Sequence, residues 1–188
     1  MKKTNSIFAK IYPLNESTRL CTIEIALNQY EDIFHKYDSA PLERRQIDSE
    51  LETYLKRCCE EIPSKYSLEL DISIPARIRE NEKEDKLRDG FKNHFSFQVY
   101  LLEKKLNKNK LNILFEIVFG FFLLWIVAIW EVDISRILLS IIENGIVIGG
   151  WVFLWDAVSK FFFTNSQLNK SYQDYKRLLN SSIIFREV

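Results

Sequence analysis

The chain has 188 residues, of which 26 are lysine or arginine and 26 are aspartate or glutamate, so its formal net charge is zero. This balance excludes a basic protein that coats nucleic acid, and no nucleic-acid partner is expected. The charges are unevenly placed, because only seven of the 53 residues in 111–163 are charged. Such a division is typical of a charged cytosolic module attached to a membrane hairpin.

The N-terminal part of the chain contains signals for strands. Apolar residues alternate with polar ones in 20–27 (LCTIEIAL) and in 67–74 (SLELDISI), which predicts two strands with one apolar face each. Pro75 ends the second of these strands. A further short strand is a candidate at 6–12 (SIFAKIY).

Helical patterns lie between and after these strands. A short helix is predicted over 30–37, and a longer one begins at Asp48 or Ser49, either of which can cap it, and ends near Pro63. From Asn81 a long helix is expected to run almost unbroken toward the first membrane segment. Its likeliest break is the run Asn107, Lys108 and Asn109. The resulting order β-α-α-β-α predicts an α/β sandwich over residues 1–105, within an α+β fold class.

The next segment predicts a membrane-spanning helix. Residues 111–130 (LNILFEIVFGFFLLWIVAIW) contain one charged residue, Glu116. At about 1.5 Å per residue, this length just crosses a hydrocarbon core of roughly 30 Å.

A second span is expected over 137–158. If 133–144 instead forms an interfacial helix, the span shifts to 145–163. Both alternatives give a transmembrane hairpin over 106–163, followed by a polar, cytosolic C-terminal tail over 164–188.

Basic residues near the ends of the spans predict the orientation of the hairpin. The connection 131–136 has one basic residue, whereas several flank the hairpin on its other side. They are Lys104, Lys105, Lys108, Lys110, Lys160, Lys170, Lys176 and Arg177. Both termini should therefore face the cytoplasm of a bacterial inner membrane.

Aromatic and small residues add two features to the hairpin. The candidate interfacial aromatics are Trp130, Trp151 and Trp155. The candidate helix-packing seam is Gly145, Gly149 and Gly150, which includes a GxxxG spacing. Two interpretations of the seam stay open, namely contact between copies of the chain and packing of the second span on the first.

Three carboxylates, Glu116, Glu143 and Asp156, lie within or near the spans. A carboxylate at membrane depth is unfavourable and normally has a reason. One interpretation is a polar constriction or ion path in an oligomer. The favoured interpretation places all three at the membrane interfaces, where Glu116 can pair with Lys110 or Lys160.

No motif for catalysis, cofactor binding or metal binding is recognised. The three cysteines, Cys21, Cys58 and Cys59, have no CxxC spacing and are expected to be reduced thiols. His35 has no local support as a catalytic base. His94 falls on the apolar stripe of the long helix, where a packed neutral imidazole is the expected state and pH sensing the alternative.

Arg44 and Arg45 form the one compact basic spot of the module. They could grip a carboxylate, a phosphate or a lipid headgroup. The favoured interpretation is structural, with salt bridges to Asp38 and Asp48 that hold the loop closed.

Two segments resemble a family of small bacterial membrane proteins. One is Asp38-x-x-Pro41-x-x-x-Arg45-x-Ile47-Asp48, and the other is the run 150–155 (GWVFLW), which matches a GWVxxW motif. The resemblance covers residues 20–176, although a proline and paired tryptophans expected after Trp155 are absent. It implies a cytosolic α/β module, two spans and an inner-membrane location, with no established reaction.

The sequence therefore predicts a non-enzymatic bacterial inner-membrane protein. Its module would bind an unknown cytosolic protein or sense a signal, and its hairpin would anchor it in the bilayer and self-associate. The alternative is an oligomeric membrane effector or pore, for example in phage defence. A third hypothesis is an enzyme of unrecognised type.

Overall fold

The structure is a computed structural model, which describes residues 12–15, 18–129 and 137–188. Its internal contacts divide the chain into two compact units. One unit, here called the sheet unit, consists of Met1–Tyr100 together with Tyr172–Val188. The other, the hairpin unit, is Leu101–Ser171. The α+β class is confirmed, because a four-stranded mixed sheet occurs together with two long apolar helical segments.

The four strands follow one another across the sheet in chain order. They are β1 (Leu14–Asn15), β2 (Leu20–Ala26), β3 (Ser67–Ile74) and β4 (Ser182–Glu187). β2 and β4 both pair in parallel with β3, whereas β1 pairs antiparallel with β2. The two strands expected from alternating residues are confirmed as β2 and β3. The candidate strand at 6–12 lies outside the described residues, apart from Tyr12.

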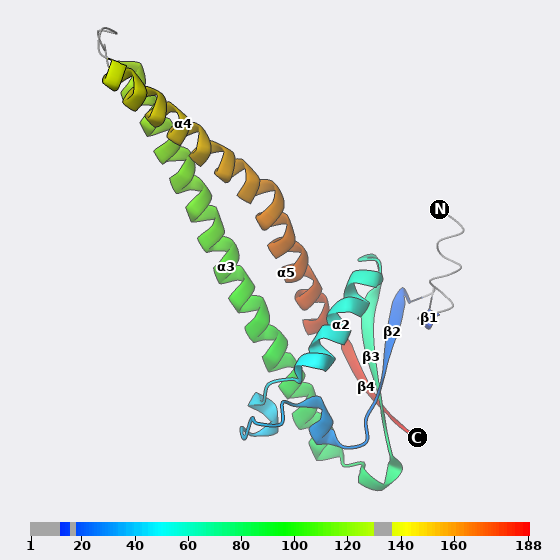
Figure 1. Ribbon diagram of the computed structural model, residues 1–188. Coiled ribbons are helices and arrows are strands. Elements are labelled where there is room, and N and C mark those ends of the chain that lie inside the picture. Colours follow the sequence, from blue (N-terminus) through cyan, green and yellow to red (C-terminus); the bar gives the residue numbers. More distant parts are fainter. Residues whose placement is uncertain (1–11, 16–17, 130–136) are drawn as a thin grey trace. The chain divides into compact units, whose positions relative to one another are not determined.

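The last strand comes from the end of the chain. Glu69 to Ile74 of β3 pair with Ser182 to Glu187 of β4, and Figure 1 shows β4, in red, beside β3. Residues 164–188, predicted as a polar tail, instead contain α5 (Asn165–Leu179) and this strand. The hairpin is therefore inserted in the connection between two neighbouring parallel strands.

Helices cover one face of the sheet, where the core lies. α2 (Ser49–Glu61) is the crossover between β2 and β3, and Asp48 caps it by accepting a hydrogen bond from the Glu50 N–H. The helix predicted over 30–37 is shorter, a 3₁₀ turn at Tyr30–Ile33. The core of the unit includes Cys21, Ile23, Leu55, Cys58, Cys59, Leu68, Leu70, Ile72, Leu87, Phe91, Phe95, Leu178 and Phe185.

The long helices extend from the sheet unit into the hairpin unit. α3 (Asn81–Ile129) is one helix of 49 residues, so the break predicted at Asn107 to Asn109 does not occur. The cost of a few asparagines, below about 1 kcal/mol each, is small for so long a helix. The return limb consists of α4 (Ile137–Ser159), a π-helical turn (Lys160–Thr164) and α5.

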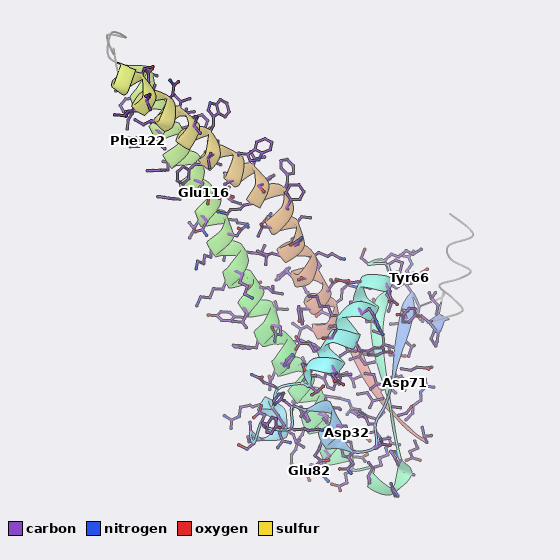
Figure 2. All side chains as sticks on the ribbon, viewed as in Figure 1. Asp32, Tyr66, Asp71, Glu82, Glu116 and Phe122 are labelled. Atoms are coloured by element: carbon purple, nitrogen blue, oxygen red, sulfur yellow. The ribbon has the colours of Figure 1, made fainter. Side chains whose placement is uncertain are left out.

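Both limbs contain a segment that is long and apolar enough to cross a membrane. They are α3 and the continuous stretch Ser140–Leu179. Only 11% of the most apolar window of each is buried in the described structure, unlike the core helix of a soluble protein. Large side chains such as Phe115, Phe122, Trp151 and Trp155 are exposed along them, and Figure 2 labels Phe122 and Glu116 on α3.

Candidate functional site

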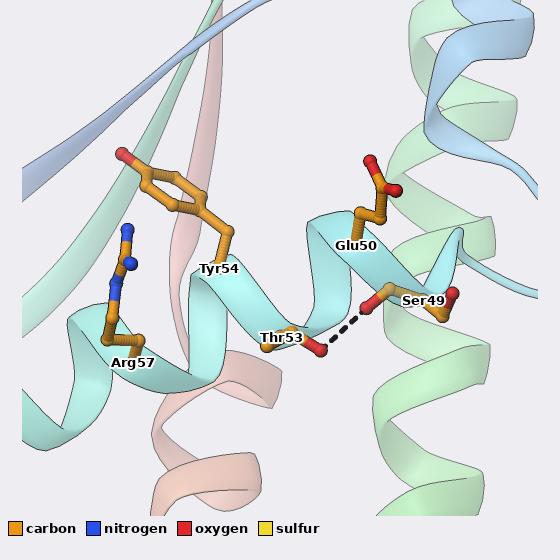
Figure 3. Close-up of a pocket in the computed structure, with 5 residues that line it drawn as sticks. All are labelled: Ser49, Glu50, Thr53, Tyr54 and Arg57. Carbon is orange, nitrogen blue, oxygen red and sulfur yellow. Dashed lines mark hydrogen bonds between the residues drawn. The ribbon is translucent and has the colours of Figure 1, made fainter.

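A hollow beside α2 has a volume of about 430 Å³ and offers little chemistry. Figure 3 shows its lining, in which the Thr53 hydroxyl donates a hydrogen bond of 2.7 Å to the Ser49 carbonyl. The Arg57 guanidinium lies over the Tyr54 ring, 5.7 Å from its centroid. Together with Glu50, these side chains include no nucleophile paired with a base, so the hollow is not a candidate for covalent catalysis.

The loop before α2 is closed mainly by backbone groups. The Asp38 carboxylate accepts hydrogen bonds from the N–H groups of Ala40 (2.9 Å) and Gln46 (2.8 Å). The bond from Gln46 has the larger effect and that from Ala40 the smaller, and both hold the pKa of Asp38 below its ordinary value. The Arg45 guanidinium donates to the Ala40 carbonyl and lies over the Phe34 ring. Arg45 thus contributes to the loop, while Arg44 is exposed. The predicted salt bridges of these two residues to Asp38 and Asp48 do not occur in the part of the chain that the structure describes.

Three side chains from three helices meet within the sheet unit. On α2, Glu52 accepts a hydrogen bond of 2.5 Å from the Tyr175 hydroxyl of α5. The Nε2 atom of His94, on α3, lies 3.6 Å from the same carboxylate, and its Nδ1 accepts the Ile47 N–H at 3.5 Å. The sequence indicated His94 but not its partners, since their approach depends on how the helices pack.

This junction predicts a defined response to acid. His94 is the main cause that lowers the pKa of Glu52, with the Tyr175 hydroxyl adding to it and partial burial opposing it. Because the folded-state pKa lies below the unfolded value of about 4.5, the stabilisation is present above pH 4.5 and is lost as the pH falls through the folded-state value. Replacing Glu52 with Gln should flatten the fall in unfolding free energy below pH 4.5. Urea unfolding followed by circular dichroism would measure this.

The matched control is Glu50→Gln, on the same helix in an exposed position. It should leave the acid slope unchanged. An equal slope for the Glu52 variant and the native chain would contradict the prediction.

Arg177 of α5 joins the end of α2 to the turn that follows it. Its guanidinium donates to the carbonyls of Cys59 (2.8 Å) and Ile62 (3.0 Å), which are free at the C-terminal end of a helix. It also reaches the carbonyls of Pro63 and Tyr66. The sequence analysis used Arg177 only as a charge beside the membrane, whereas its contacts join the end of α5 to α2 within the sheet unit.

The three cysteines are all buried in the sheet unit. Burial raises the pKa of the Cys21 thiol to about 11 and that of Cys59 to about 12. Thiolates of these two residues are therefore scarce at neutral pH, which opposes a role for them as nucleophiles. Among the described residues no cluster of histidine, cysteine or acidic side chains could hold a metal ion.

In the hairpin unit, α3 and α4 approach each other closely at two glycines. A Cβ atom on Gly150 would lie 3.1 Å from the Gly120 carbonyl oxygen and 2.9 Å from Leu124 Cγ. A Cβ atom on Gly120 would lie 3.0 Å from the Gly150 carbonyl oxygen. Gly149 makes only an ordinary contact, and nothing lies within 4 Å of Gly145. Gly150 thus packs against α3 of the same chain. The sequence analysis did not identify its partner Gly120, because this glycine is isolated in the sequence.

Substituting isoleucine for Gly150 should weaken the packing of the two helices. The added side chain has no room at the crossing, and overpacking costs typically about 1–3 kcal/mol. Gly145→Ile is the matched control on the same helix, where the space is open. Thermal unfolding in detergent would compare the two variants. Equal midpoints would show that the crossing is not as close as the contacts indicate.

One lysine brings two of the three hairpin carboxylates together. The Lys160 ammonium contacts the carboxylate of Glu116 on α3 and lies 2.8 Å from that of Asp156 on α4. Of the two partners considered for Glu116, the structure selects Lys160 over Lys110. Glu116 is buried, and its Oε2 atom has no hydrogen-bond partner in the described part of the chain.

Glu143 lies apart from the ion cluster, defined as Glu116, Asp156 and Lys160. Glu143 is 13 residues from Asp156, roughly 20 Å along the helix. Trp151 and Trp155 are 62% and 75% exposed, as lipid-facing or interfacial rings would be. Trp130 lies outside the described residues.

Comparison with known proteins gives this chain no relative: no family model, no curated protein and no solved structure matches it.

Proposed function

We propose that this chain is a non-enzymatic protein of the bacterial inner membrane, with two spans and both termini in the cytoplasm. The pairing of β4 with β3 carries the proposal. Strands of one sheet must fold in one compartment, so the chain between β3 and β4 crosses a bilayer an even number of times. A hairpin of two spans is the simplest arrangement that satisfies this condition.

The surface of the hairpin supports a lipid environment. Large apolar side chains are exposed on both limbs, among them Val118 and Trp125 on α3 and Ile148 and Trp151 on α4. Soluble monomers rarely expose an apolar surface of this extent. Acyl chains, together with further copies of the hairpin, would cover these side chains.

The sheet unit is the part that would bind a cytosolic protein or sense a signal. Two helical connections, α3 and the return limb ending in α5, join it to the hairpin. Because the end of α5, from Tyr172 on, and β4 belong to the sheet unit, a search for partners requires the full chain. The resemblance to small two-span bacterial proteins stays a prediction.

Reporters at the two ends of the chain would test the topology. A fluorescent protein that matures only in the cytoplasm should be bright at both termini, and alkaline phosphatase should be inactive at both. A variant lacking residues 137–164, which leaves one span, is the control that should export the C-terminal reporter. Export of either terminus of the intact chain, or its extraction from membranes by carbonate, would refute the proposal.

The ion cluster supports a second candidate function, that of an oligomeric membrane effector or pore. A buried carboxylate within an apolar hairpin is a feature of many ion pathways. Depolarisation on expression that is lost with Glu116→Gln and kept with the matched control Glu143→Gln would favour this function. An unchanged membrane potential would count against it.

A further inference from the structure

The segment of α3 just before its apolar stretch carries an unusual set of lysines. Four lysines occur within seven residues, all exposed, and none has an acidic partner in the described part of the chain. They are Lys104, Lys105, Lys108 and Lys110. The set is here called the juxtamembrane lysines.

The start of the same helix shows how its other basic residues are arranged. Lys83 lies 2.9 Å from Glu80, Lys86 lies 2.6 Å from Glu82, and Arg88 lies 2.6 Å from Asp85. These basic residues are thus paired with carboxylates three or four positions earlier. From residue 101 to 115 the chain has a single acidic residue, Glu103. Acidic partners become scarce where the helix approaches its apolar part.

Like charges at this spacing are unfavourable by themselves. Lys104 and Lys108 are four residues apart, and Lys105 and Lys108 are three apart, so their ammonium groups share one side of the helix. The four ammonium groups thus form a cationic surface, which attracts anions. An anion from outside the described chain would relieve the repulsion between them.

The depth of the lysines identifies the anion. Leu111 and Leu114, which follow directly, are 67% and 58% exposed and begin the lipid-facing stretch. At about 1.5 Å per residue, Lys104 lies roughly 10 Å before Leu111 and Lys110 less than 2 Å before it. A headgroup layer of roughly 5–8 Å borders the hydrocarbon core. The lysine side chains are long and flexible, so their ammonium groups can reach the phosphate groups in this headgroup layer.

We propose that the juxtamembrane lysines bind the headgroups of anionic phospholipids. The inference rests on the proposed membrane placement of the hairpin and adds a lipid class to it. The cationic surface followed by an apolar one matches the order of phosphate and acyl chain in a single lipid. Each lysine near an anionic surface adds attraction, which salt weakens.

Lipid retention by the full chain tests the inference. The purified protein in an uncharged detergent is mixed with equal amounts of phosphatidylglycerol and phosphatidylcholine, and native mass spectrometry counts the lipids that stay bound. We expect the native chain to prefer phosphatidylglycerol by at least about tenfold at low salt. Replacing all four juxtamembrane lysines with glutamine should abolish this preference. A control replaces four exposed lysines of the sheet unit, namely Lys36, Lys65, Lys92 and Lys176.

The outcomes separate this inference from the proposed function. A preference that survives in the juxtamembrane variant, or that disappears equally in the control, overturns the inference. Displacement of the lipid by millimolar inorganic phosphate would indicate a site for free phosphate and also overturn it. In each of these cases resistance to carbonate extraction would leave the membrane placement intact. Failure of that resistance in the native chain would refute the proposed function itself.

Discussion

Deleting residues 181–188 should unfold the sheet unit while the hairpin remains in the membrane fraction. The deletion removes β4, which pairs with Glu69 to Ile74 of β3. The whole edge of β3 is then exposed. The side chain of Phe185 is only 6% exposed, and truncating a phenylalanine buried in this way costs about 3–5 kcal/mol of stability. The net stability of a domain is only about 5–15 kcal/mol. Loss of the complete strand therefore exceeds what the unit can tolerate.

Charge effects add to the loss of packing. Asp71, on β3, is 3% exposed, and its partner is Arg186 of β4 at 2.9 Å. Glu187 of β4 also accepts from Arg79, which in turn pairs with the buried Glu84. Without β4, Asp71 loses its counter-charge, and a buried charge without a partner is strongly unfavourable.

The buried cysteines provide the measurement. In the folded chain the three thiols are inaccessible, so a maleimide should label none of them without denaturant. The truncated chain should be labelled at all three. Ile184→Ser, at an outward-facing position of β4 that is 39% exposed, is the control and should stay unlabelled. A truncated chain whose thiols stay protected would contradict the role assigned to the strand.

This dependence has a consequence for synthesis of the protein. The strand that completes the sheet, β4, follows both apolar segments in the sequence. The sheet unit can therefore finish folding only after the hairpin has been made. A fragment limited to residues 1–105 lacks α5 and β4, so it is not a substitute for the full chain.

The sequence predicted those elements whose signal is local. The alternation in β2 and β3, the cap at Asp48 and the two apolar segments each extend over many neighbouring residues. β4 has a weaker signal, because Ile183, Ile184 and Phe185 are three consecutive apolar residues in a strand of six. Its partner strand lies more than 100 residues earlier, and no local pattern specifies that pairing.

The candidate site shows the same limit. Glu116 could be identified from a charge in an apolar run, and Lys160 was one of two possible partners. Only the packing of α3 on α4 decides between them. Glu52 and Tyr175 have no unusual neighbours in sequence, and their contact with each other joins residues 123 positions apart. Residue types and spacing thus indicated the charged groups, while tertiary contacts determined the pairs.

Replacing Lys160 with methionine should disrupt the hairpin more than removing either of its partners. Methionine keeps much of the length of the side chain but not the charge, and it leaves Glu116 and Asp156 without their shared counter-ion. Breaking a buried ion pair by removing one partner is strongly destabilising, because the remaining charge stays in an unfavourable environment. We expect the ratio of folded to unfolded hairpin to fall by at least about tenfold.

A second substitution distinguishes the effect of charge from that of packing. Adding Glu116→Gln to the Lys160→Met variant removes the buried negative charge, so it should recover most of the lost stability. Glu116→Gln alone should be mild, since Lys160 keeps its pair with Asp156 at 2.8 Å. Lys176→Met, on the exposed side of α5, is the control. Thermal unfolding in detergent and resistance to trypsin would order the variants. If the double variant is no more stable than Lys160→Met, charge compensation is not what holds α3 and α4 together at this point, and packing around the lysine stem is the dominant contribution.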